Sequence, residues 1–187
     1  MGVFEFLLAL YSIVAGLGMA VIVRSVGQII EARDRVRLYW VHSCFILVAF
    51  VAQVVSWFSL WRFATHTPWT VADTLFLLSI PLLLYLVSHL VVPELDDGLV
   101  HDLRDYYYRH ARWTQGLLLA GIVISLVGEA FILGHFELSA PQKLRMVFGL
   151  VLLPGTLTTN PRVHSVQAGL LLVLMAFGVS GVSIPIG

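Results

Sequence analysis

The chain has 187 residues, of which 59% are hydrophobic and only 12% charged, and its formal net charge is zero. A soluble domain needs a charged surface that this composition does not supply, and nucleic-acid binding needs an excess of basic charge, so neither class is expected. We therefore predict an all-α integral membrane protein whose main partner is the lipid bilayer, with residues 1–187 forming a single transmembrane domain.

The first two predicted membrane spans follow each other closely. The first covers about 4–23 and continues as a short amphipathic segment over 24–34. The second covers about 38–62. Its two ends carry the aromatic residues that are typical of bilayer interfaces, which are Tyr39, Trp40, Trp57 and Trp61. These two spans account for the first third of the chain.

The third and fourth predicted spans are separated by the most hydrophilic stretch of the chain, 93–112. The third span covers about 71–92 and begins at Thr70 and Asp73, whose spacing predicts a capping box. The fourth covers about 113–134. The tyrosine- and arginine-rich segment before it, 100–113, predicts an interfacial helix on the cytoplasmic side that leads into the fourth span.

The last part of the chain predicts two further segments, which makes a bundle of six. Ser139 and Gln142 have the spacing of a capping box, and an apolar run over 146–157 follows. This run contains Pro154 and is short for a bilayer, so it is badly tilted, re-entrant or discontinuous. The sixth span covers about 162–184 and is rich in glycine.

The distribution of basic residues predicts the orientation. Eight arginines lie in the segments after the first, third and fifth spans, and three basic residues lie on the other side. The eight are Arg24, Arg33, Arg35, Arg37, Arg104, Arg109, Arg112 and Arg162. Basic loops stay in the cytoplasm, so we expect a multi-pass protein of the inner membrane with both termini outside. If the fifth segment does not cross, the C-terminus lies inside instead.

Glu129 is the leading candidate for a functional residue, because a carboxylate deep in an apolar span must be paired, protonated or next to water. Ser125 lies one turn earlier on the same helix face. One interpretation is a proton- or ion-binding acid, and the other is a structural ion pair with Arg62. Gln53 and Ser56 lie on a polar stripe of the second span, which predicts contact with protein or water.

Other polar residues have plainer interpretations. Asp73 is a candidate for the polar path, but a helix cap explains it better. Interhelical hydrogen bonding is likewise the common role of a residue such as Gln53. His42 and His89 are weak candidates for a metal or haem site, since both are expected near the same membrane surface. We expect no cofactor and assign no catalytic residue.

These patterns leave three classes of function open. The first is a channel or transporter for an ion, a proton or a small solute, with a path along Glu129, Gln53 and Ser125. The second is a non-catalytic membrane subunit or scaffold, which would use its glycine-rich faces to bind a partner or further copies of itself in a homo-oligomer. The third is a haem- or metal-dependent membrane redox protein.

Overall fold

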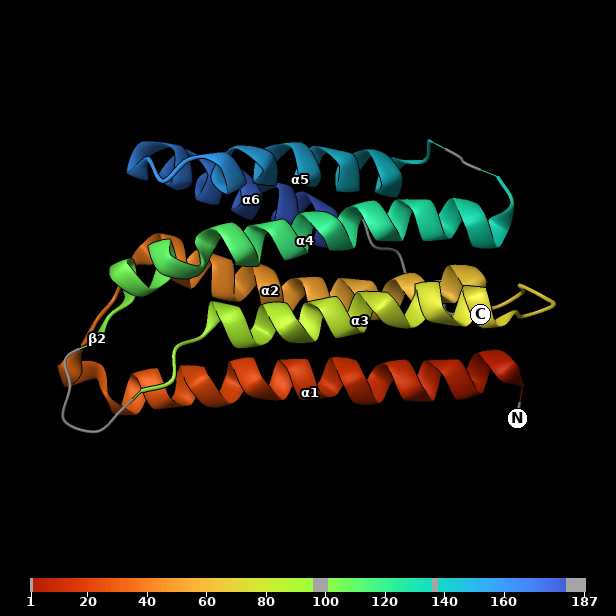
Figure 1. The fold of residues 1–187 in the computed structure, drawn as a ribbon, viewed down its shortest axis with the longest axis horizontal. Coiled ribbons are helices and arrows are strands. Elements are labelled where there is room, and N and C mark those ends of the chain that lie inside the picture. Colours follow the sequence, from red (N-terminus) through yellow and green to blue (C-terminus); the bar gives the residue numbers. More distant parts are fainter. Residues whose placement is uncertain (1, 96–100, 136–137, 181–187) are drawn as a thin grey trace.

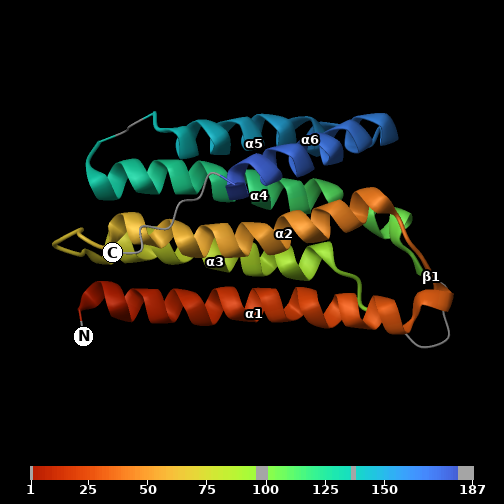
Figure 2. The ribbon, with the colours of Figure 1, turned by 180° about the vertical axis from the view of Figure 1, so that it is seen from behind.

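Six α-helices lie side by side in a computed structural model that describes residues 2–95, 101–135 and 138–180 (Figure 1). The helices are α1 (Val3–Glu31), α2 (Trp40–Phe58), α3 (Val71–Val91), α4 (Leu103–Leu133), α5 (Ala140–Leu157) and α6 (Pro161–Ser180). Successive helices run in opposite directions along the long axis of the bundle (Figures 1 and 2). The prediction of an all-α fold is confirmed.

Five of the described helices are long and apolar enough to cross a membrane, and α5 is the one that is not among them. α4 packs between α3 and α5, whereas α1 and α5 lie at opposite sides of the bundle (Figure 1). The second predicted span corresponds to α2 together with a 3-10 helix, η2 (Ser59–Phe63). Part of the predicted sixth span, 181–184, lies outside the described residues.

The helix predicted to lead into the fourth span is continuous with it, and the fifth segment is one unbroken helix. The segment 100–113 and the fourth span join in α4, a single helix of 31 residues. The fifth segment is α5, which runs without a break through Pro154. Pro154 lies in the last turn of α5, where a missing N–H removes only one helical hydrogen bond, so the helix is not interrupted.

A short parallel strand pair joins two distant loops at one end of the bundle. β1 (Val36–Arg37), which follows a 3-10 helix η1 (Arg33–Arg35), pairs with β2 (His101–Asp102). This pairing was not predicted, because two residues are too short for an alternating pattern to be recognised. It brings the arginine-containing segment after α1 next to the start of α4.

Gly18 of α1 allows three helices to approach closely. A β-carbon at Gly18 would overlap the Gln53 side chain of α2 and would lie 3.2 Å from the Ser88 hydroxyl oxygen of α3. Gln53 Nε2 donates to Ser88 Oγ at 3.0 Å. Gln53 therefore links α2 to α3 next to α1, and this contact requires glycine at position 18.

Alanine substitutions at Gly18 and Gly16 should change stability in opposite directions. Alanine favours a helix over glycine by about 1 kcal/mol, and Gly16 has no atom within 4 Å of its β-carbon position. Gly16→Ala should therefore leave stability unchanged or raise it. Gly18→Ala should lower it by about 1–2 kcal/mol, because the Gln53 amide must leave Ser88. Thermal unfolding in detergent measures the stability of both variants. Equal changes in stability would contradict the close contact between Gly18 and Gln53.

Candidate functional site

The first buried polar group, the Glu129 cluster, consists of Arg62, Ser125, Glu129, Gln142 and Arg145. Glu129 Oε2 accepts from Arg62 Nη1 of η2 and, at 2.8 Å, from Arg145 Nη2 of α5. Glu129 Oε1 accepts from Gln142 Nε2 of α5. Arg145 Nη1 also lies 3.4 Å from Ser125 Oγ. Three donors from two different elements therefore satisfy both oxygens of the carboxylate.

Part of this cluster was predicted from the sequence. Arg62 and Ser125 were expected beside Glu129, but Gln142 was assigned to a helix cap. The helix begins where predicted, with Ser139 at its N-cap, but the predicted capping box is wrong, because Ser139 makes no side-chain capping hydrogen bond. Gln142 instead reaches across the α4–α5 connection to Glu129. Arg145 was counted only as a loop charge, although its spacing of three residues from Gln142 places the two on one face of α5.

The second buried polar group, the His164 cluster, consists of Tyr107, Gln115, His164 and Gln167, and each of these side chains is at most 4% exposed. His164 Nε2 lies 2.8 Å from the Thr158 carbonyl oxygen, so this nitrogen carries the proton. Tyr107 therefore donates its hydroxyl proton to His164 Nδ1, at 2.7 Å. Gln115 Nε2 donates to Tyr107 at 3.0 Å, and Gln167 Nε2 donates to Gln115 Oε1 at 2.8 Å. The hydrogen bonds thus share one direction, from Gln167 towards the α5–α6 connection.

Gly155 of α5 makes room for this network. A β-carbon at Gly155 would overlap the amide oxygens of both Gln115 and Gln167. Gln167 Nε2 also lies 2.8 Å from the carbonyl oxygen of Val151 and 3.1 Å from that of Leu152, both in the last turns of α5. The α6 amide therefore contacts α5 backbone directly, which only a residue without a side chain at position 155 permits.

Each cluster contains one buried amide oxygen that has no hydrogen-bond partner among the described residues. These are Gln142 Oε1 and Gln167 Oε1. The partners of the two Nε2 atoms are acceptors, so exchanging the amide nitrogen and oxygen would leave donors unpaired. Gln53 Oε1 and His42 Nδ1 are buried acceptors of the same kind elsewhere in the bundle.

An apolar layer separates the two clusters along α4, α5 and α6. By helix rise, Arg145 and Gly155 lie about 15 Å apart on α5. Leu118, Leu152 and Leu171 belong to one hydrophobic cluster between these levels. At Gly149, a β-carbon would lie 3.4 Å from Leu119 and 3.6 Å from Ile122 of α4. The two polar levels are therefore separated by a buried apolar level to which α4, α5 and α6 all contribute.

The other predicted path residues lie apart from these clusters. Gln53 pairs with Ser88, and the Ser56 hydroxyl donates to the Gln53 carbonyl oxygen within its own helix at 2.8 Å. Asp73 forms the predicted capping box with Thr70 and lies 3.5 Å from His66 Nε2. The predicted set therefore divides, and only Arg62, Ser125 and Glu129 come together.

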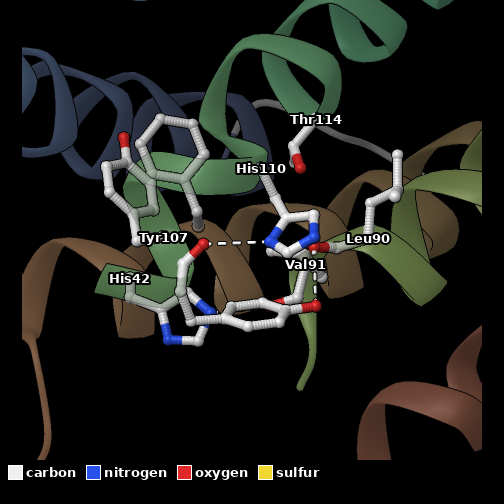
Figure 3. Close-up of a pocket in the computed structure, with 8 residues that line it drawn as sticks. His42, Leu90, Val91, Tyr107, His110 and Thr114 are labelled. Carbon is white, nitrogen blue, oxygen red and sulfur yellow. Dashed lines mark hydrogen bonds between the residues drawn. The ribbon is translucent and has the colours of Figure 1, made fainter. Parts of the chain in front are cut away.

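His42 and His89, the weak candidates for a metal or haem site, lie in different surroundings. His42 is 1% exposed, and its Nε2 donates to the Val91 carbonyl oxygen at 2.7 Å. It lines a cavity of about 10 Å³ together with Tyr107, His110 and Thr114, which is room for one water molecule (Figure 3). His89 is exposed and packs against Tyr85. The described part of the chain contains no group of three or more histidine, cysteine or acidic residues placed to hold a metal ion.

Comparisons with protein-family models, with curated proteins and with solved structures found no match to this chain. What can be inferred about its function comes from the two clusters and from the helices that position them.

The Glu129 cluster predicts an order of stabilities among its variants. Glu129→Gln leaves two guanidinium groups without a counter-charge and should destabilise the protein by about 3 kcal/mol. Arg145→Gln should cost about 1 kcal/mol, because Arg62 and Gln142 still satisfy the carboxylate. Chemical unfolding in detergent gives both values. A larger loss for Arg145→Gln than for Glu129→Gln would show that the carboxylate is not the centre of the cluster.

Proposed function

We propose that this protein is a membrane transport protein, a channel or a carrier, that moves an ion or a small polar solute between α4, α5 and α6. One observation carries the proposal: each of the two polar levels has a buried amide oxygen without a partner, Gln142 Oε1 in the Glu129 cluster and Gln167 Oε1 in the His164 cluster. Both levels include side chains of α4, and α5 lines both of them, whereas α6 contributes Gln167 and His164 to the second level alone.

Physical chemistry supports this interpretation over a purely structural one. A buried amide oxygen without a hydrogen bond costs about 1–3 kcal/mol, so two of them on one side of a small bundle need an explanation. A water molecule, a cation or a donor group of a passing solute would satisfy them. Polar residues inside membrane spans mark such pathways, and an apolar constriction between polar levels is a common gate.

The proposal places the bundle in the inner membrane, with its arginine-rich end in the cytoplasm and both termini outside. In support, the β1–β2 pairing holds the segment that carries Arg33, Arg35 and Arg37 beside the start of α4, which carries Arg104. These arginines, separated by more than a third of the described chain, gather at one end of the bundle. Positive charge of this kind favours the cytoplasmic side.

Flux measurements in proteoliposomes test the proposal. Wild-type protein should conduct at least one of protons, potassium, chloride or a small neutral solute, followed by pH-sensitive and ion-sensitive dyes and by light scattering. Gln167→Leu and Gln142→Leu should each lower that flux about tenfold or more, because each replaces a polar contact of the path by an apolar side chain that excludes water and ions.

Gln53→Leu is the matched control. This substitution removes the same buried amide group as the other two, but from α2, outside the α4–α5–α6 contact. The flux through the Gln53→Leu variant should therefore stay near the wild-type value. Equal loss in all three leucine variants would point to general damage and contradict the path. No flux of any tested solute through folded wild-type protein would overturn the proposal and favour a non-catalytic membrane subunit.

A further inference from the structure

The Glu129 cluster carries an unbalanced positive charge. Two guanidinium groups, Arg62 and Arg145, face a single carboxylate, so the formal charge of the three groups is two positive minus one negative, or +1. Both arginines contact the same oxygen, Glu129 Oε2. The buried acid of α3, Asp73, is already engaged by Thr70 and His66. Among the described residues, no second carboxylate joins the cluster.

The arginines also keep hydrogen-bonding capacity that the protein does not use. Arg62 donates from Nε to the Ser59 carbonyl oxygen at 3.0 Å and from Nη1 to Glu129, and its Nη2 has no partner in the described part of the chain. Arg145 uses Nη2 for Glu129, and its Nη1 makes only the long 3.4 Å contact to Ser125. A guanidinium group has five N–H donors, so several remain available.

Exposure leaves these donors accessible while the acid stays covered. The Arg62 and Arg145 side chains are 24% and 23% exposed, whereas that of Glu129 is 9% exposed. An ion that approaches this end of the bundle therefore meets the guanidinium groups before the carboxylate. In a partly desolvated site, two such groups attract an anion strongly and bind it by charge-assisted hydrogen bonds.

We propose that Arg62 and Arg145 together bind a small anion, and that the solute which this protein transports is anionic. The second part rests on the proposed transport function. Glu129 holds the two guanidinium groups at a fixed position and neutralises one of the two charges. The site therefore has a net charge of +1, which attracts an anion but still allows it to dissociate. A halide, inorganic phosphate or the phosphate of a lipid headgroup shares this chemistry.

Anion binding can be measured apart from transport, by thermal unfolding of the detergent-solubilised protein. Sodium bromide is titrated against sodium gluconate at constant ionic strength, and inorganic phosphate is tested in the same way. Bromide at about 100 times its dissociation constant should raise the wild-type Tm by about 5 °C. Arg145→Gln should abolish the shift, because the remaining arginine and Glu129 cancel. Arg145→Lys keeps the charge and should retain most of it.

Two further variants separate this site from general salt effects. Glu129→Gln raises the charge of the site to +2, so bromide should bind at least tenfold more tightly and should partly restore the stability that this variant loses. Arg112→Gln removes an exposed arginine at the start of α4 and should keep the wild-type shift. A bromide shift that is equal in wild-type protein, Arg145→Gln and Glu129→Gln would overturn the anion site.

The source of the anion and the link to transport are decided by two more measurements. In nanodiscs that contain phosphatidylglycerol, loss of the bromide shift relative to nanodiscs of the zwitterionic lipid phosphatidylcholine would identify an anionic lipid headgroup as the occupant and overturn the anionic solute. Bromide binding with no flux of any solute would keep the site and overturn transport. Flux of cations alone, without anion binding, would keep transport and overturn the anion site.

Discussion

The interaction on which this bundle depends most is the pairing of buried polar side chains between helices. Apolar contacts alone give six hydrophobic helices little preference for one relative packing over another. In an environment without water, each polar group must find a partner in the protein or remain at a cost. Glu129 finds three donors from η2 and α5. These contacts fix the positions of α4 and α5 and tie both of them to the end of α2.

The same constraint explains why glycine occurs where helices meet through polar groups. At Gly18 and at Gly155, an amide side chain of a neighbouring helix occupies the space that a β-carbon would need. Glycine weakens a helix intrinsically, so its presence at these points reflects the gain from close interhelical contact.

Charge and hydrogen bonding together connect the two clusters with the proposed transport of an anion. The Glu129 cluster would receive the solute through its excess positive charge, and the His164 cluster would present neutral dipoles with one common direction. The buried apolar layer around Leu152 lies between them and would have to open for passage. An apolar constriction with polar groups on either side is a common form of gate.

The sequence by itself determined the all-α class, the approximate bounds of the helices and the cap at Thr70 and Asp73, because apolar runs and caps are local patterns. It also identified Glu129, since an acid within an apolar span is conspicuous wherever the helices lie. Only the tertiary structure decided the partners of Glu129, the separation of Gln53 and Asp73 from it, and the network around His164. Those depend on which helix faces meet, and Gln142, Arg145 and Gln115 carry no local signal of their partners. The physical reason is that a polar side chain is satisfied across helices, over sequence separations that no periodicity records.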